Sequence, residues 1–210
     1  MSKEHKYEGK QITVYFNAAR CIHAGKCVSG LPEVFNADIG GHWIKPDACD
    51  ADILARQIEA CPSGALRYEM MNKPEQIPAI NTIKVETDGP LTIHADYSMN
   101  GIKPDSPRAT LCRCGASRIK PWCDGSHESI AFADSGDVAI FNPDEQLDTG
   151  TVAIKPLKDG PLYLVGPHQI CDAQGNTARV CKKSALCRCG ASKNKPYCDA
   201  AHAAIGFKAE

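Results

Sequence analysis

The sequence has almost no net charge and no long stretch of apolar residues. Its 24 Lys and Arg residues nearly balance its 25 Asp and Glu residues, and no long acidic or basic block interrupts it. A chain without a basic cluster is not expected to bind nucleic acid or an anionic membrane as its main partner. No apolar run approaches the roughly 18 residues that cross a bilayer, and residues 1–7 carry no apolar segment of a secretory signal. We therefore expect a cytoplasmic protein that does not act at a membrane.

The sequence also lacks the common catalytic signatures. It contains no P-loop and no glycine-rich dinucleotide motif, and no Ser-His-Asp pattern stands out. We therefore expect no enzymatic activity. The apolar fraction of 43% and the charged fraction of 23% are ordinary for a globular protein, and 210 residues suffice for two or three small domains.

Cysteine, in contrast, is abundant. The chain contains 12 cysteines, and most of them fall in short clusters. In a secreted protein such cysteines would suggest disulfides. Cytosolic thiols stay reduced, and clustered cysteines there more often bind metal. The composition therefore favours metal sites, and the spacing of the cysteines has to identify them.

An internal repeat occupies the C-terminal two thirds of the chain. Residues 111–127 return, with few changes, as residues 186–202. The similarity extends upstream, where residues 88–94 resemble residues 159–165. Each copy has the pattern of a strand after a Gly-Pro turn, a hairpin partner, a cysteine-rich loop and a short helix. The repeat predicts two similar β-rich units.

Each copy carries three cysteines and one histidine in the spacing Cys-x-Cys-x₈-Cys-x₃-His. The eight residues are Cys112, Cys114, Cys123 and His127 in the first copy and Cys187, Cys189, Cys198 and His202 in the second. A Cys-x-Cys pair on an extended loop directs two thiolates to one side, which is enough to hold one iron. The Cys-x₃-His pair shares one face of a short helix and can hold a second iron. Zinc bound by the same four residues is the alternative, although structural zinc usually uses Cys pairs two to four residues apart.

The N-terminal third has a different cysteine pattern. Cys21, Cys27 and the later Cys61-Pro62 resemble the C-x₂-C-x₂-C and C-P pattern of a bacterial ferredoxin, with Ala24 in place of the second cysteine. Three thiolates are enough for a [3Fe–4S] cluster. His23 is a candidate extra ligand, which would allow a [4Fe–4S] cluster instead. A domain that has lost its cluster is the third alternative.

At the repeated segments the chain resembles the CDGSH iron–sulfur domain family. The family motif is C-x-C-x₂-[ST]-x₃-P-x-C-D-G-[STA]-H. The first copy matches it throughout, whereas the second has Ala200-Ala201 in place of Gly125-Ser126. The resemblance covers roughly residues 85–210 and implies one [2Fe–2S] cluster per copy, held by three thiolates and a solvent-facing histidine. It also implies that the two copies pair about a two-fold axis, so that one chain is a monomer with an internal pseudo-dimer.

The N-terminal segment has its own resemblance. Over about residues 10–70 the chain is similar to the divergent single-cluster ferredoxin family. We therefore expect an α+β protein with three domains: a small ferredoxin-like single-cluster domain at 1–75, and CDGSH units at 76–145 and 146–210. The cofactors implied are two [2Fe–2S] clusters and one [3Fe–4S] or [4Fe–4S] cluster.

The predicted function is one-electron transfer through these clusters to or from an unidentified redox protein. Delivery or storage of clusters or iron is an alternative, because protonation of a single histidine ligand competes with iron and could release the cluster to an acceptor protein. A redox sensor is a third class.

Several other residues carry weaker expectations. Arg113 and Arg188 lie between ligand cysteines, where they either offset cluster charge or are solvated. Cys49, Cys171 and Cys181 have no counterpart in the repeat and no assigned role. The packing of one copy on the other is expected to bury a set of apolar residues. These are Leu91, Leu162, Ile130, Phe132, Ile205 and Phe207.

Overall fold

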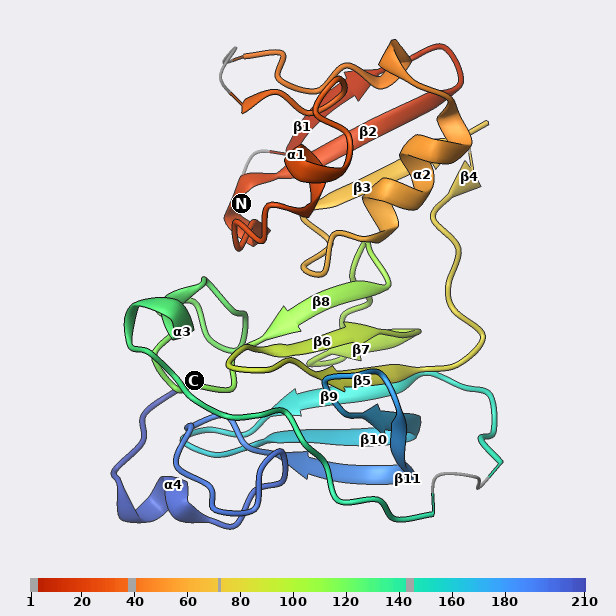
Figure 1. The fold of residues 1–210 in the computed structure, drawn as a ribbon. Coiled ribbons are helices and arrows are strands. Elements are labelled where there is room, and N and C mark those ends of the chain that lie inside the picture. Colours follow the sequence, from red (N-terminus) through yellow and green to blue (C-terminus); the bar gives the residue numbers. More distant parts are fainter. Residues whose placement is uncertain (1–3, 38–40, 72, 143–145) are drawn as a thin grey trace. The chain divides into compact units, whose positions relative to one another are not determined.

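The computed structural model describes residues 4–37, 41–71, 73–142 and 146–210 (Figure 1). The chain forms two compact units, Met1–Gln76 and Ile77–Glu210, which are described separately. Both mix helices with sheets, and strands predominate in the second unit. The end of the first CDGSH unit predicted at residue 145 lies outside the described residues. No described helix is both long and apolar enough to cross a membrane.

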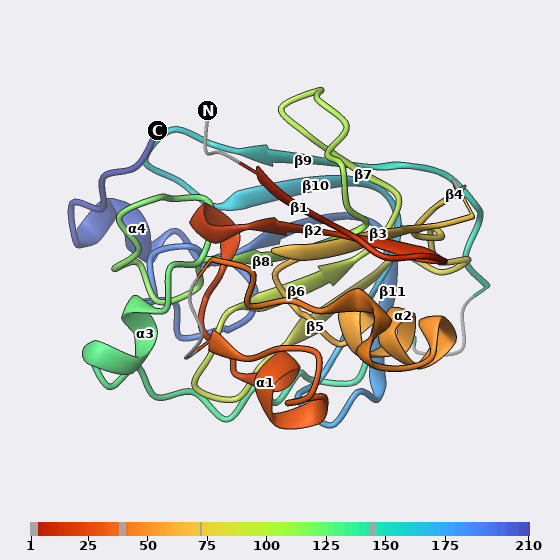
Figure 2. The same ribbon diagram turned by 90° about the horizontal axis from the view of Figure 1, so that it is seen from above.

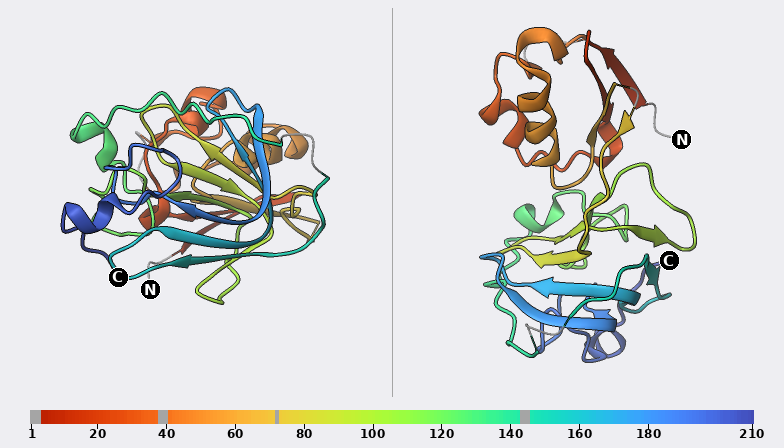
Figure 3. Two further views of the ribbon diagram at one scale, coloured as in Figure 1. Left: turned by 90° about the horizontal axis from the view of Figure 1, so that it is seen from below. Right: turned by 90° about the vertical axis from the view of Figure 1, so that its right-hand side faces the viewer.

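The N-terminal unit is a four-stranded antiparallel sheet with helices on one face (Figure 3). Its strands, in sheet order, are β1 (Glu4–Glu8), β2 (Ile12–Asn17), β3 (Leu66–Met70) and β4 (Lys73–Pro74). The helices are α1 (Lys26–Gly30) and α2 (Ala51–Glu59), and the 3₁₀ turns are η1 (Ala18–Arg20) and η3 (Pro46–Ala48).

The sequence periodicity explains how this unit packs. Ile12 and Val14 alternate along β2 and point into the core. Leu54 and Ile58 lie on one face of α2 and are fully buried, as their helical spacing requires. Asp50 caps α2, because its carboxylate accepts hydrogen bonds from the first-turn backbone N–H groups. The helix then ends just before Cys61.

The C-terminal unit is built on one seven-stranded sheet. Its strands are β5 (Thr82–Val85), β6 (Leu91–His94), β7 (Tyr97–Met99), β8 (Arg108–Leu111), β9 (Val152–Pro156), β10 (Leu162–Cys171) and β11 (Thr177–Leu186). The order along the sheet is β7-β9-β10-β5-β6-β8, and β11 pairs with β10. The two short helices are α3 (Ser126–Ser129) and α4 (Ala201–Ala204).

Each copy of the repeat contributes a three-stranded antiparallel group to this sheet. In the first copy β6 lies between β5 and β8, and in the second β10 lies between β9 and β11. Figure 2 shows β9 and β10 side by side. Equivalent residues occupy equivalent registers, since Leu91 faces Leu111 and Leu162 faces Leu186. The repeat in the sequence is therefore a repeat in strand pairing.

Two parallel pairings join the copies. Strand β7 of the first copy pairs with β9 of the second, and β10 of the second pairs with β5 of the first. Asn81 reinforces this connection from a buried position. Its side-chain N–H group donates to the carbonyls of Gly150 (2.7 Å) and Pro167 (2.9 Å), and its oxygen accepts from the Asp96 N–H (2.8 Å). The strands of the two copies are thus interleaved.

A large hydrophobic core shared by the two copies follows from this interleaving. Apolar residues of both copies form it, including Leu91 and Leu162, which are fully buried as predicted. Phe207 is also buried, in a separate small cluster with Cys187 and Cys189. The expected burial of Ile130 and Ile205 is wrong, because these side chains are 49% and 54% exposed. Each is the C-cap of its four-residue helix, and so lies at the end of a short surface element rather than on the sheet.

Candidate iron–sulfur sites

The Cys-x-Cys segments leave the ends of strands β8 and β11 as loops. The two sulfurs lie 3.9 Å apart in Cys112 and Cys114, and 3.7 Å apart in Cys187 and Cys189. Two sulfur ligands on one tetrahedral metal ion, each bonded at about 2.3 Å, lie about 3.8 Å apart. Each Cys-x-Cys pair therefore has the spacing that one metal ion needs.

The Cys-x₃-His segments form a second donor pair in each copy. The Sγ atom of Cys123 lies 3.4 Å from Nδ1 of His127, and the Cys198–His202 distance is also 3.4 Å. A sulfur and a nitrogen ligand on one tetrahedral ion lie about 3.6 Å apart. Among the described residues, no group of three or more Cys, His, Asp or Glu side chains is arranged around a single ion. The donors of each copy are therefore arranged as two pairs.

Polar residues of the motif shape the loop between the two pairs. The Ser117 hydroxyl donates to the Trp122 carbonyl at 2.6 Å, and Ser192 makes the matching bond to Tyr197 at 2.7 Å. The carboxylate of Asp124 accepts from the backbone N–H of Arg118 at 2.9 Å. These internal hydrogen bonds hold the loop closed. The prolines at 121 and 196 both follow cis peptide bonds.

The Asp124 carboxylate also receives the Ser126 side chain. Its Oδ1 atom accepts from the Ser126 hydroxyl at 2.5 Å and from the Ser126 N–H at 3.0 Å. Burial tends to raise the Asp124 pKa, but these hydrogen bonds and that from Arg118 bring it down to about 2. Ala201 cannot supply the hydroxyl, and only its N–H donates to Asp199, at 3.0 Å. The second copy therefore lacks one hydrogen bond of the first.

The left-handed backbone at the centre of the motif is present in both copies. Gly125 has φ of 84° and Ala200 has φ of 68°. In this conformation the Gly125 N–H donates to Cys123 Sγ and the Ala200 N–H to Cys198 Sγ, each at 3.4 Å. The alanine thus retains the geometry of the glycine, at the steric cost that a side chain incurs at positive φ.

The three thiols of the first copy do not all lose their protons easily, and a bound cation would favour their ionisation. Burial raises the pKa of Cys123 to about 11. A hydrogen bond from Cys112 lowers the pKa of Cys114 to about 6, whereas the same bond, together with burial, raises the pKa of Cys112. Metal binding displaces such protons, because thiolates are the ligand form. The donor set therefore suits a metal that binds thiolates, such as zinc or the iron of an iron–sulfur cluster.

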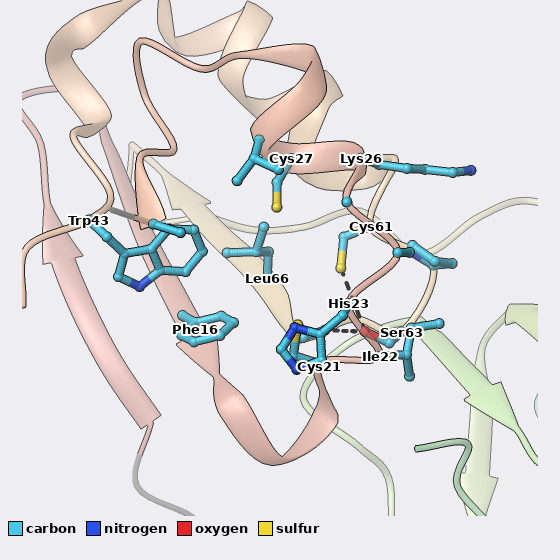
Figure 4. Close-up of a pocket in the computed structure, with 16 residues that line it drawn as sticks. Phe16, Cys21, Ile22, His23, Lys26, Cys27, Trp43, Cys61, Ser63 and Leu66 are labelled. Carbon is cyan, nitrogen blue, oxygen red and sulfur yellow. Dashed lines mark hydrogen bonds between the residues drawn. The ribbon is translucent and has the colours of Figure 1, made fainter. Parts of the chain in front are cut away.

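The N-terminal unit brings its three candidate cysteines to one cavity of about 410 Å³ (Figure 4). Cys21 follows η1, Cys27 lies in α1 and Cys61 follows α2. Burial raises the pKa of the Cys21 and Cys27 thiols, and each is raised further by Cys61. The predicted spacing thus places three thiols around one cavity.

Other residues of this cavity are relevant to a fourth ligand, in addition to the three thiols. His23 has positive φ of 57° and lies beside Cys21, and Ala24 also lines the wall. The Sγ atom of Cys61 is 3.7 Å from the hydroxyl of Ser63. The rings of Phe16 and Trp43 pack edge to face with their centroids 4.9 Å apart. They form an apolar part of the cavity wall. The cavity fits a compact group that three thiolates hold on one side.

Comparison with known families agrees with both kinds of site. The family model described as "Divergent 4Fe-4S mono-cluster" matches residues 7–70. The model described as "Iron-binding zinc finger CDGSH type" matches twice, at residues 82–128 and 159–203. The chain is a tandem CDGSH protein with an N-terminal divergent 4Fe–4S mono-cluster domain.

Curated relatives match part of the chain. "Uncharacterized protein YjdI" of Escherichia coli K12 is 47% identical over 62 residues, which are 30% of this chain and 80% of the relative. The protein of the same name in E. coli O157:H7 matches to the same extent. No solved structure matches the chain.

The arginines inside the two CDGSH motifs are buried, so the alternative of a solvated loop charge is wrong. Arg113 donates to the carbonyls of Gly89 (3.0 Å) and Glu86 (2.6 Å), and its guanidinium also pairs with Asp134. Arg188 makes the matching bonds to Gly160 (3.0 Å) and Leu157 (2.6 Å). Each arginine therefore ties the cysteine loop of its CDGSH repeat to the first hairpin turn of that repeat.

Three cysteines lie outside the candidate cluster sites of this tandem CDGSH protein. Cys49 donates weakly to the Asp50 carbonyl at 3.4 Å, and Cys171 is buried with its sulfur 3.9 Å from the Thr177 hydroxyl. Cys181 differs, because its sulfur lies 3.3 Å from Nε2 of His168. Only the pairing register of β10 and β11 reveals the contact.

Proposed function

We propose that the protein transfers single electrons through three iron–sulfur clusters. In each CDGSH repeat, the Cys-x-Cys pair would hold one iron of a [2Fe–2S] cluster and the Cys-x₃-His pair the other. The observation that carries the proposal is the arrangement of the donors of each copy as two pairs, in each of which the two donor atoms lie 3.4–3.9 Å apart. Two pairs suit two irons, whereas one zinc ion requires all four donors around a common centre.

The histidine ligands would set the redox range of the two CDGSH clusters. An imidazole replaces a thiolate and makes the cluster less negative, which raises its reduction potential, as in Rieske centres. The backbone N–H groups that donate to Cys123 and Cys198 act in the same direction. We therefore expect potentials above those of plant-type ferredoxins.

The N-terminal domain would hold a cuboidal cluster. Its three thiols support [3Fe–4S], and the position of His23 in the cavity wall supports [4Fe–4S] if the imidazole binds a fourth iron. The family description, which names a 4Fe–4S cluster, favours the second form. This cluster is the proposed entry or exit point for electrons.

We further propose that the two CDGSH repeats form an internal pseudo-dimer. The parallel pairings β7–β9 and β10–β5 are reciprocal between the copies. The ligand loops also meet, since Cys114 and Cys189 form an antiparallel bridge. A Cβ atom on Gly115 would lie 2.5 Å from the Cys189 carbonyl oxygen, and one on Gly190 would lie 2.5 Å from that of Cys114. The two glycines therefore permit a close, symmetric approach.

This contact supports electron transfer as the leading function. A ligand of one cluster site is joined by main-chain contact to a ligand of the other, which gives an electron a short path between them. Delivery of clusters is the second candidate, because protonation of His127 or His202 would weaken the site. The His127 side chain is only 11% exposed, unlike the solvent-facing histidine that the resemblance implies, and this burial favours retention of the cluster. The partner would be an unidentified cytoplasmic redox or cluster-acceptor protein.

Anaerobic purification with iron and sulfide analysis tests the proposal. About seven irons per chain are expected with [3Fe–4S] in the N-terminal domain, and about eight with [4Fe–4S]. Electron paramagnetic resonance of the oxidised and reduced protein would identify each cluster type, and a redox titration would show reversible one-electron steps. A colourless protein that contains zinc in place of iron would refute it.

A further inference from the structure

A cysteine, a histidine and a serine meet between strands β10 and β11, outside the cluster ligands. His168 and Cys181 are directly opposed in the strand register, next to an irregularity between Val165 and His168. The His168 side chain is fully buried, and its Nε2 atom lies 3.3 Å from Cys181 Sγ and 2.8 Å from the Ser184 hydroxyl. The thiol itself is only partly buried. A nucleophile and a base are therefore within hydrogen-bonding distance.

The other ring nitrogen fixes the role of the histidine. Nδ1 lies 2.8 Å from the Gly166 carbonyl oxygen, which can only accept a hydrogen bond. Nδ1 must therefore carry the hydrogen, and Nε2 is left as the acceptor. Burial lowers the pKa of His168, and the positive charge of Arg179 lowers it further. The imidazole is thus a neutral base, and the Ser184 hydroxyl and the Cys181 thiol compete for the lone pair of its Nε2 atom.

A cation lies on the same strand as the thiol. Arg179 precedes Cys181 by two residues on β11, so both side chains leave the same side of the strand. The guanidinium lies over the rings of Phe141 and Tyr197, at 5.2 and 5.4 Å from their centroids. Arg179 therefore carries a fixed positive charge on the side of the strand from which the thiol leaves, and nearby positive charge favours a thiolate.

The first CDGSH repeat does not carry this group. Tyr97 and Ala109 occupy the positions of His168 and Ser184, and Ala109 lies opposite Ile93 as Ser184 lies opposite Leu164. The first repeat forms the same donor pairs, but its β6–β8 pairing ends at His94 and Arg108, before the positions that match His168 and Cys181. The donor pairs of a CDGSH repeat therefore form without this group.

We propose that Cys181 is a redox-reactive thiol, activated by His168, that reacts with hydrogen peroxide. The thiol gives its proton to Nε2 of His168. The thiolate sulfur then attacks one peroxide oxygen, and an S–O bond forms as the O–O bond breaks. The departing hydroxide takes the proton from His168 and leaves as water. Two electrons pass from sulfur to peroxide, and Cys181 becomes a sulfenic acid.

The wild-type protein contains a matched control for this reaction. Cys49 is also partly buried and is not a candidate ligand, but its neighbours are acidic. Burial raises the pKa of Cys49, and the charges of Glu33 and Asp50 raise it further. The full-length protein, loaded with its metal, would be treated with limiting hydrogen peroxide and dimedone, which traps sulfenic acids. Peptide mass spectrometry would then give the labelling rate of each thiol.

Cys181 is expected to be labelled roughly tenfold or more faster than Cys49, because a positioned base assists its ionisation. His168→Asn should bring the rate down to that of Cys49 while the visible spectrum of the protein stays unchanged. Ser184→Ala should keep or raise the rate, since the hydroxyl competes for Nε2. Equal rates at Cys181 and Cys49 in the wild type, or an unchanged rate in a folded His168→Asn protein, would overturn the proposal. The wild-type comparison decides the matter even if the histidine variant does not fold.

Discussion

At the scale of single residues, the buried arginines show how a charge can be structural and electrostatic together. Arg113 is fully buried and carries hydrogen bonds to two main-chain carbonyls and a carboxylate. Its planar fork satisfies acceptors that a lysine could not reach together. The guanidinium also lies 5.1 Å from the centroid of the Phe132 ring. The same residue therefore orients the cysteine loop and brings positive charge near a cluster site.

Replacing this arginine tests its structural role. We expect Arg113→Leu to lower the free energy of unfolding by about 3 kcal/mol or more, because it leaves buried carbonyls and a carboxylate without their donor. Arg118→Leu is the control, since that side chain is 89% exposed and its ion pair with Asp124 spans 3.6 Å. Such a surface pair contributes at most about 1 kcal/mol. Equilibrium denaturation of both variants measures the difference, and similar losses would contradict the assignment.

The histidine ligands can be separated from the thiolates by substitution. His127→Cys and His202→Cys are expected to keep their clusters, lower the reduction potentials and slow acid-induced cluster loss. The added thiolate charge disfavours a further electron, and the imidazole nitrogen is the natural point of proton attack. Potentiometry and acid-decay rates check this. Unchanged potentials and unchanged acid lability would mean that the histidines are not ligands.

At the scale of elements, the residue that precedes each short helix differs between the repeats by one methyl group. It is Gly125 before α3 and Ala200 before α4. Ala200 holds the left-handed angle that Gly125 adopts without strain. Ala200→Gly should therefore stabilise the second repeat, and Gly125→Ala should destabilise the first, each by about 1 kcal/mol. Denaturation followed by circular dichroism measures both shifts. Shifts of the same sign in the two variants would show that the angle is not what limits stability here.

The loop contact between the repeats gives a second test at this scale. Gly115→Ala would place Cβ 2.5 Å from the Cys189 carbonyl oxygen, so the two ligand loops must separate. We expect loss of cluster from both repeats. Gly101→Ala is a close control, because its φ of 82° is similar and no atom lies within 4 Å of the new Cβ. Iron content and visible absorbance would distinguish the two variants. Equal retention of iron in both would contradict the role of the loop contact.

At the scale of the whole molecule, each compact unit has its own hydrophobic core. A fragment of residues 77–210 is therefore expected to fold alone as a monomer, whereas residues 77–142 alone should not. The shorter fragment leaves β5 and β7 without their partners β10 and β9. Sedimentation and circular dichroism test this. A shorter fragment that is folded and monomeric would show that the interleaved strands are dispensable.

Some features of this architecture could be predicted from the sequence because they are local. Spacing and periodicity over a few residues predict three of them. These are the repeat at residues 111–127 and 186–202, the helix after Asp50 and the strand at Ile12. The family matches confirm the tandem CDGSH organisation and the N-terminal domain. The cluster types and the ligand roles stay predictions, although the structure brings the predicted donors together.

Other features could not be predicted, because they depend on contacts between distant segments. The parallel pairing of three-residue β7 with β9 leaves no periodic signal in so short a strand. Ile130 and Ile205 have apolar side chains, yet their position at the ends of short helices exposes them. The approach of Cys181 to His168 requires the exact register of a long hairpin with an irregularity.

The interleaving of strands has a thermodynamic consequence for metal loading. Strands of the two repeats pair with each other, so both donor sets are carried by one shared sheet. Iron bound at the first repeat would stabilise this sheet and thereby raise the affinity of the second repeat for iron. By linkage, the second then does the same for the first. Partly loaded molecules should therefore be scarce, and a population titrated with limiting iron should divide into empty and filled proteins.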